Sequence, residues 1–419
     1  MAPTAVVLSA SERRKALIAP DRLWIAVFIS SFLGLFVDGF DLQMLSITLP
    51  SLKAEWGLSN VQAGLIATWS LAGMAIGGMG GGWLADRFGR VRMAAWMIVL
   101  FSVGSMLLGF TQSYEQFVTI RFITGIGLGA EYTICTMLMA EYVPTRIRTT
   151  VLGTLQASYS LGYLAAALLA GMILPEHGWR WMYYIAIVPV VLAVFVRRYI
   201  PEPMSWQERS RMPRADQGNE WADIWRDPKI RKNFALWMLA SSLLQFGYFG
   251  VNTWLPSYVA SELGINFKTM TVYIIGTYSA AIAGKVVTGW LADRYGRRVM
   301  FAVGGLSTAV MLPLLFMFQS PGTIVVLMIV FGFLYGMPYA VNATYMNESF
   351  PTHLRGTATG GAYNVGRIGA MLAPLVIGII ADNSTIGLGL SVLGIAYALA
   401  ALVPFFFIKE KQYDPSAPE

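Results

Sequence analysis

The chain has 419 residues, of which 56% are hydrophobic and only 13% are charged, and its mean hydropathy is +0.57. Soluble globular proteins carry about 25% charged residues, so this composition excludes an ordinary soluble protein and indicates a membrane protein. The net charge of +7 does not require a nucleic-acid partner, and we expect none, because most Lys and Arg residues lie between apolar segments where they orient membrane proteins.

Twelve apolar segments are long enough to cross a bilayer, which takes about 20 residues of helix. We expect membrane-spanning helices over residues 22–49, 60–85, 90–111, 114–141, 148–174, 180–200, 233–260, 268–292, 297–319, 322–348, 354–381 and 386–408. The positive-inside rule then predicts a multi-pass protein of the inner, or plasma, membrane with both termini in the cytoplasm.

A repeated sequence divides the chain into two similar halves. The segment GGWLADRFGR at 81–90 recurs as TGWLADRYGR at 288–297, which is 207 residues further along (288 − 81 = 207). Glu141 and Arg148 recur as Glu348 and Arg355 at the same displacement. This duplication predicts an all-α fold of two pseudo-symmetric six-helix bundles, over 1–200 and 233–419, joined by a cytoplasmic linker at 201–232, with the site between the halves.

The first expected helix carries Asp38 and Asp41, which lie on one face because they are three residues apart. The helix over 114–141 brings Arg121 to the same depth, so we predict that Arg121 forms a buried pair with Asp38 or Asp41. Glu131 lies deeper, near the middle of the bilayer, where a carboxylate indicates function. The alternatives are a solvated helix end for Asp41 or Asp38, a purely structural pair for Arg121, and a neutral, hydrogen-bonded Glu131.

The helix over 354–381 carries Tyr363, Asn364 and Arg367 within about one turn. Arg367 lies too deep in the bilayer to reach either surface, and its planar guanidinium suits a carboxylate. We therefore predict that Arg367 is the main substrate ligand, with Tyr363 and Asn364 beside it; the alternative is a structural bridge to an acid. Lys285 is either a further ligand or a side chain that extends to the membrane surface.

Several other expected helices carry polar and aromatic residues at helical spacing. Polar side chains in lipid face inward, so we predict that these residues line the substrate site, although aromatic residues at this spacing more often pack a core. They are Gln156, Tyr159, Gln245, Tyr248, Asn252, Tyr339 and Asn342. Together they indicate a cavity for a planar or apolar body that carries an anionic group.

The doubled G-x-x-x-D-R-x-G-R motif resembles that of major facilitator superfamily transporters, and the resemblance covers nearly the whole chain. It implies that the motif residues act in gating, as a latch between the halves on the cytoplasmic side. The residues concerned are Gly82, Asp86, Arg87 and Arg90, and Gly289, Asp293, Arg294 and Arg297. The second repeated motif either joins this latch or forms a charged turn, and its residues are Glu141, Arg148, Glu348 and Arg355.

Within that superfamily, the sequence Asp38-Gly39-Phe40-Asp41 is similar to the aromatic acid:proton symporters and to muconate and sialic acid carriers. The resemblance implies that Asp38, Asp41, Arg121 and Glu131 take part in proton coupling. The predicted function is proton-coupled uptake of an organic carboxylate, such as an aromatic acid or a small unsaturated dicarboxylate. The alternatives are a sialic or sugar acid symporter, an uncoupled facilitator or antiporter, and, outside transport, a membrane nutrient receptor.

Enzymatic activity is not expected from this sequence. The two histidines, His177 and His353, lie in expected loops, and there is no phosphate-binding loop, nucleophile constellation or metal-ligand cluster. We therefore expect neither a cofactor nor a metal. The expected partners are the carboxylate, the proton and the lipid bilayer, and the resemblance implies a monomer.

Overall fold

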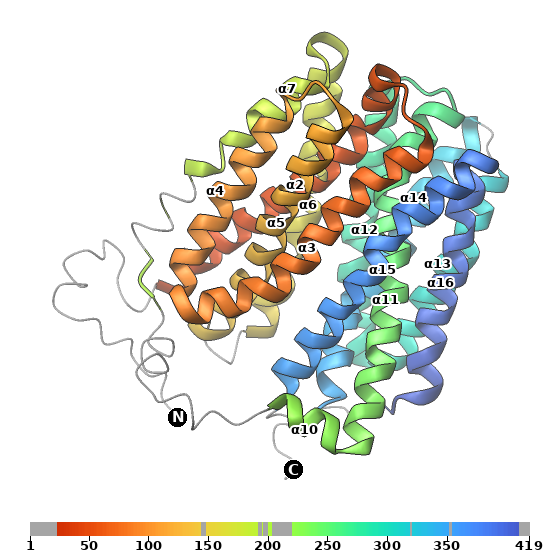
Figure 1. Ribbon diagram of the computed structural model, residues 1–419. Helices are drawn as coiled ribbons and strands as arrows, with labels where there is room; N and C mark the ends of the chain where they lie inside the picture. The colour runs from red at the N-terminus through yellow and green to blue at the C-terminus, as the bar shows by residue number, and fades with distance from the viewer. Residues whose placement is uncertain are drawn as a thin grey trace. The chain divides into compact units, whose positions relative to one another are not determined.

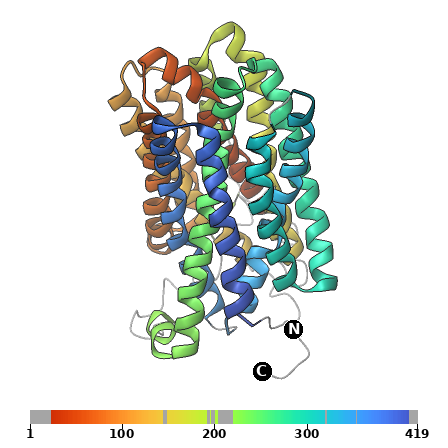
Figure 2. The same ribbon diagram turned by 90° about the vertical axis from the view of Figure 1, so that its right-hand side faces the viewer.

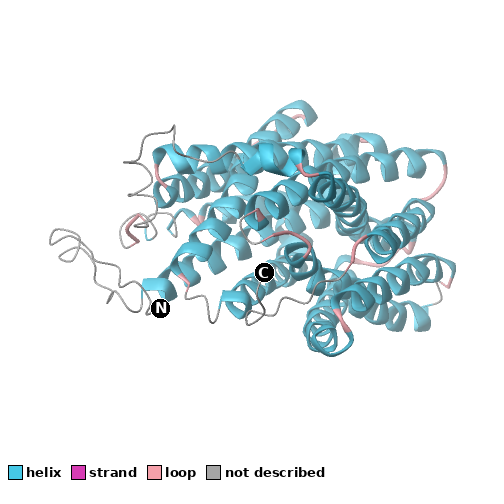
Figure 3. Ribbon diagram, turned by 90° about the horizontal axis from the view of Figure 1, so that it is seen from below, coloured by secondary structure: helices cyan, strands magenta, loops and turns pink. Residues whose placement is uncertain are grey.

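The computed structural model describes residues 23–143, 148–191, 195, 200–202, 220–318, 321–351 and 354–409. All regular structure within these ranges is helical, as Figure 3 shows. Eleven of the described helices are long and apolar enough to cross a membrane. The predicted segment 180–200 lies partly outside the described residues.

The helices of the first half follow the predicted order closely. They are α2 (Leu23–Trp56), α3 (Asn60–Phe88), α4 (Arg90–Leu108), α5 (Tyr114–Tyr142), α6 (Arg148–His177) and α7 (Trp179–Tyr184), followed by a 3-10 turn (Ile185–Ile187). Helix α2 continues to Trp56 rather than ending near residue 49, because its last turn carries Glu55, whose carboxylate binds Arg180 at 2.7 Å.

The second half repeats this arrangement. Its helices are α10 (Glu220–Arg226), α11 (Pro228–Ser257), which continues as a π-helical turn (Tyr258–Glu262), α12 (Phe267–Tyr295), α13 (Arg297–Met317), α14 (Pro321–Glu348), α15 (Arg355–Asn383) and α16 (Ile386–Phe407). Helix α10 is a short helix within the predicted linker. Helix α11 lies between α15 and α16 (Figures 1 and 2).

The repeated motif forms the same turn in both halves. Gly89, between α3 and α4, has φ 104°, and Gly296, between α12 and α13, has φ 94°. Only glycine adopts this left-handed region without steric cost, so the glycine of the motif is what allows two long helices to meet at so short a connection.

Close contacts between helices recur at positions related by the same displacement of 207 residues. At three pairs of glycines, each pair 207 residues apart, an added Cβ would lie 2.0–2.3 Å from a backbone oxygen of the neighbouring helix, so no other residue fits without moving the helices apart. The contacts in the first half are Gly77 with Ile126, Gly125 with Ser70 and Gly129 with Met74. Adding 207 to every number gives the contacts of the second half, which are Gly284 with Phe333, Gly332 with Thr277 and Gly336 with Ala281.

The described residues form two compact units. The first contains those before Leu58 and those from Trp69 to Glu202, and the second contains Leu58–Thr68 and all described residues from Glu220 onward. The first turns of α3 belong to the second unit because Asp382 of α15 accepts hydrogen bonds from the backbone of Asn60 and Val61 at 2.8 and 3.0 Å.

Candidate functional site

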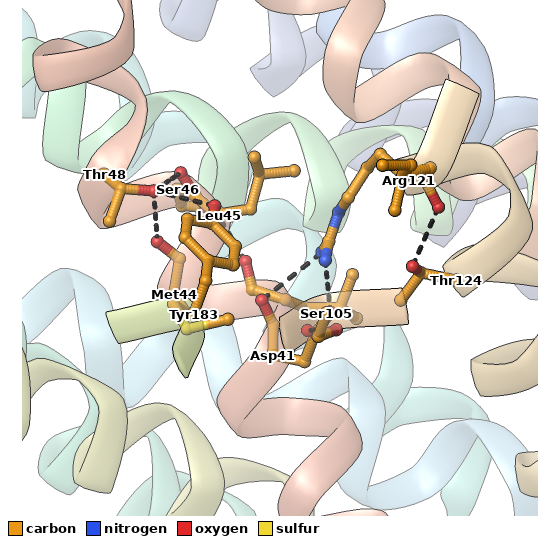
Figure 4. Close-up of polar contacts among 11 residues, drawn as sticks. Asp41, Met44, Leu45, Ser46, Thr48, Ser105, Arg121, Thr124 and Tyr183 are labelled. Carbon is orange, nitrogen blue, oxygen red and sulfur yellow. Dashed lines mark hydrogen bonds and ion pairs between the residues drawn. The ribbon is translucent and has the colours of Figure 1, made fainter. Parts of the chain in front are cut away.

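The first unit contains a buried ion pair between α2 and α5. Arg121 Nη1 lies 2.6 Å from Asp41 Oδ2, and the two side chains are 0% and 3% exposed. Figure 4 shows that Arg121 reaches across to the backbone of α2 as well, where it donates to the carbonyl of Asp41 at 3.3 Å. Ser105 of α4 donates a further hydrogen bond to the Asp41 carboxylate. Of the two predicted partners, Asp41 is therefore the one that balances the charge of Arg121.

A second acidic group lies further along the same two helices. Glu131 and Asp38 are both completely buried, and their carboxyl groups lie close enough to interact. Glu131 forms no ion pair with any described residue. Two buried carboxylates this close would repel one another if both were ionised, so the pair is a candidate proton site.

Two small residues make room for Glu131. An added Cβ on Gly34, one turn before Asp38, would lie 2.0 Å from Glu131 Oε1. Cys135, one turn after Glu131, places its sulfur 3.9 Å from the same oxygen. Neither Cys135 nor Gly34 is among the site residues predicted from the sequence.

In the second unit, α11 and α15 bring together several of the predicted substrate ligands. Arg367 is 6% exposed, and the neighbouring Gly366 lies against Ser241 and Gln245. Gln245 donates to the backbone oxygen of Tyr363 at 2.9 Å. The predicted residues Arg367, Tyr363 and Gln245 therefore share one region of the α11–α15 interface.

Asn252 is the centre of a tyrosine cluster formed by α11, α12 and α14. Its amide donates to Tyr335 at 2.7 Å and to the backbone of Tyr248 at 3.0 Å, and its oxygen accepts from Tyr278 at 2.6 Å. The rings of Tyr248 and Tyr335 are stacked, with 5.2 Å between centroids, and Tyr339 lies 4.4 Å from Tyr248. Sequence reasoning missed Tyr278, although a buried asparagine needs such partners.

Three buried amide oxygens of the second unit have no hydrogen-bond partner among the described residues. They belong to Gln245, Asn342 and Asn364. Buried polar atoms are almost always hydrogen-bonded, so these groups have spare capacity for a ligand or for water. All three were predicted from the sequence as substrate-binding residues, and that role stays a prediction.

The other predicted substrate ligands are less informative. Tyr159 and Lys285 are half-buried, and the Tyr159 ring lies 5.2 Å from that of Tyr163. The side chain of Gln156 lies outside the described residues. Ligand roles for these three also stay predictions.

Charged groups connect the repeated motifs in the second unit. Arg297 lies 3.2 Å from Asp293 and 3.2 Å from Glu348, so it links the turn between α12 and α13 to the end of α14. Arg87 and Arg294, at equivalent positions, are exposed and lie over Trp83 and Trp290 at 5.6 and 5.8 Å. Gly82 and Gly289 have no close neighbour that an added Cβ would meet within 3.4 Å.

The corresponding region of the first unit includes a residue that the sequence did not indicate. Glu202 accepts hydrogen bonds from the backbone of Val91 and Arg92, each at 3.0 Å, at the start of α4. Arg90 beside them is buried. The side chains of the remaining predicted gating residues, Asp86, Glu141, Arg148 and Arg355, lie outside the described residues.

Comparison with known proteins decides the family. The model of the Major Facilitator Superfamily matches residues 31–360 and 269–419. The chain belongs to the Major Facilitator Superfamily. It is therefore a multi-pass membrane transporter and not an enzyme.

The relatives of this transporter include carriers of organic acids. It is 52% identical to the cis,cis-muconate transport protein of Acinetobacter baylyi, over 94% of this chain and 96% of that protein. It is 32% identical to a probable 4-methylmuconolactone transporter of Cupriavidus pinatubonensis, over 89% and 88%. Its fold is like that of the crystal structure of a D-xylose–proton symporter, with a TM-score of 0.78, 24% identity, and coverage of 92% and 98%.

Proposed function

We propose that this transporter takes up an organic carboxylate together with a proton, with small unsaturated dicarboxylates of the cis,cis-muconate type as the first candidates and aromatic acids next. The observation that carries the proposal is the completely buried Glu131, which is in contact with Asp38 and in no ion pair with a described residue. The similarity to a cis,cis-muconate transport protein supports the substrate class.

The coupling follows from the balance of charges. Asp41 and Arg121 neutralise one another, so the proton is carried by Asp38 and Glu131. Away from the ends of the expected spans there are three basic side chains (Arg121, Lys285 and Arg367) and three acidic ones (Asp38, Asp41 and Glu131). A bound proton therefore adds a positive charge, which a carboxylate on Arg367 offsets, so each ligand favours the binding of the other.

We further propose that the transporter acts as a monomer in the inner membrane, with both termini in the cytoplasm. The orientation is supported by the concentration of Lys and Arg in the segments at one side of the predicted spans, and the monomer rests only on the resemblance to the superfamily. In this orientation, the contacts of Arg297 with Asp293 and Glu348 form part of a cytoplasmic latch.

Uptake into proteoliposomes tests the function. Radiolabelled cis,cis-muconate, an aromatic acid, a neutral sugar and an organic cation are compared with and without an inward proton gradient. The gradient is expected to stimulate uptake of the carboxylates alone. Uptake that is indifferent to the gradient, or that is best for the sugar or the cation, would contradict the proposal and favour an uncoupled facilitator.

Two variants separate binding from coupling. Arg367→Ala is expected to abolish carboxylate binding. Glu131→Gln is expected to retain exchange of carboxylate across the membrane but to lose its stimulation by the gradient. Glu115→Gln, which changes an exposed acid in the first turn of the same helix, is the matched control and is expected to behave as the unaltered protein.

A further inference from the structure

A pocket of about 540 Å³ lies where α13 begins and α16 ends, away from the residues of the proposed transport site. It is lined by Arg298, Val299, Phe405 and Lys409. Two of these four side chains are cationic, and there is no carboxylate among the described residues that line the pocket. The guanidinium of Arg298 lies 4.7 Å from the centre of the Phe405 ring, which holds it in place over an apolar wall.

The pocket lies at the end of a close, antiparallel helix contact. Gly305 of α13 meets Ala401 of α16, and further along Ala309 meets Gly394, so the residue numbers rise on one helix as they fall on the other. Figure 1 shows the two helices side by side. The contact continues toward Arg298 and Phe405, which face one another at its end.

Both helices expose an apolar stripe to the surroundings. On α13 the stripe consists of Val299, Val303, Leu306, Val310, Leu314 and Met317. On α16 it consists of Leu388, Val392, Ile395, Leu399 and Phe406. Viewed down the axis of each helix, the stripe lies about 120° around the helix from the residues that contact the other helix. In both helices this rotation runs in the direction in which the residue numbers rise. Because the helices are antiparallel, this puts the two stripes on the same face of the pair.

We infer that this face binds an anionic phospholipid, with the headgroup phosphate between Arg298 and Lys409 and the acyl chains along the two stripes. Basic pockets at helix ends attract anionic headgroups, whereas an apolar stripe tens of ångströms long suits only a molecule with hydrocarbon chains. The end of α13 and α16 in question is the one that we propose faces the cytoplasm. The inference does not depend on the transported substrate.

Native mass spectrometry of the purified full-length protein tests the inference. The protein is stripped of lipid and mixed with micelles that contain equal amounts of phosphatidylglycerol and phosphatidylcholine, and the lipids that stay bound are counted. We expect phosphatidylglycerol to be retained in preference. The double variant Arg298→Gln/Lys409→Gln is expected to reduce that preference roughly tenfold, since each basic residue near a membrane surface contributes appreciably to anionic lipid binding.

Three controls make the result decisive. Lys229→Gln/Lys232→Gln removes the same charge from exposed positions at the start of α11 and is expected to leave the preference unchanged. Arg298→Lys keeps the charge and is expected to retain most of the binding, which shows that a loss in the double variant does not come from misfolding. Inorganic phosphate at millimolar concentration is expected not to displace the lipid.

Equal retention of the two lipids, or an unchanged preference in Arg298→Gln/Lys409→Gln, would overturn the inference. Displacement of phosphatidylglycerol by inorganic phosphate would also overturn it, because the pocket would then be a site for free anions rather than for a lipid.

Discussion

At the scale of single residues, the Asp41–Arg121 pair is fully enclosed, and both charges depend on it. Replacing Asp41 by Asn leaves Arg121 charged and without its counter-ion, a change that typically costs about 3–5 kcal/mol. We expect Asp41→Asn to lower the melting temperature of the purified protein strongly in a thermal unfolding assay. The double variant Asp41→Asn/Arg121→Gln is expected to recover part of the loss.

The Glu55–Arg180 pair provides the comparison, because its side chains are 38% and 34% exposed. Pairs in contact with water contribute about 0–1 kcal/mol, so Glu55→Gln is expected to change the melting temperature little. Equal effects of Asp41→Asn and Glu55→Gln would show that burial does not set the strength of the Asp41–Arg121 pair.

Gly34 offers a separate test of the proposed proton site. In Gly34→Ala the new methyl group would meet the end of the Glu131 side chain, which can move aside. We therefore expect little loss of stability but a clear loss of gradient-stimulated uptake, because the carboxyl group leaves its place beside Asp38. Gly80→Ala, where an added Cβ meets no atom within 4 Å, is the control. Unchanged coupling in Gly34→Ala would argue against a positional role for Glu131.

The sequence predicted which residues carry charge inside the membrane, but not how they pair. Asp38 and Asp41 lie three residues apart, so depth alone left either as the partner of Arg121. The structure selects Asp41 because Ser105 of α4 and the Arg121 side chain converge on its carboxylate. That convergence depends on the rotation of α4 and α5 about their axes, which apolar segments without strong periodicity do not define.

At the scale of helices, the duplicated glycine contacts predict that the two halves are equally sensitive to replacement of a contact glycine by alanine. Gly129→Ala and Gly336→Ala each drive a methyl group into a backbone oxygen of the adjacent helix, and overpacking of this kind typically costs about 1–3 kcal/mol. We expect both variants to lower the yield of monodisperse protein in size-exclusion chromatography. Gly80→Ala and Gly360→Ala, which face open space, are expected to have no effect.

The tyrosine cluster around Asn252 gives a second prediction at this scale. Asn252→Leu removes three hydrogen bonds, two of which join α11 to α12 and α14, and buried polar groups left without partners typically cost about 1–3 kcal/mol each. We expect a lower melting temperature. Asn383→Leu, which changes an exposed residue at the end of α15, is the control. Normal stability with loss of carboxylate binding would instead identify Asn252 as a ligand.

The helices themselves were largely predictable, because a bilayer demands about 20 apolar residues and little else. The ends of the helices were less predictable from the sequence. Helix α2 continues to Trp56 through a polar turn, and α11 continues as a π-helical turn over Tyr258–Glu262. Both extensions depend on partners far along the chain, such as Arg180 for Glu55, which hydropathy alone does not indicate.

At the scale of the whole molecule, the proposed orientation can be tested with a membrane-impermeant maleimide. The buried Cys135 is first replaced by Ser. In that background Lys268→Cys is expected to react in intact cells, whereas Lys229→Cys is expected to react only after the membrane is opened. Both positions are exposed and lie at the first turns of α12 and α11. Reaction of both residues in intact cells would contradict the proposed topology.

The two halves kept the contacts that hold their helices together and changed the groups that carry charge. The positions 207 residues after Asp38, Asp41 and Glu131 are Gln245, Tyr248 and Pro338. The second half therefore has the same contacts between helices but lacks the buried acidic residues. A symmetric ancestor with two identical copies would have carried either two acid clusters or none. The present asymmetry is therefore a specialisation of the first half. If the proposed coupling holds, a protein built from two second halves would retain the contacts between helices but would have no means of using a proton gradient.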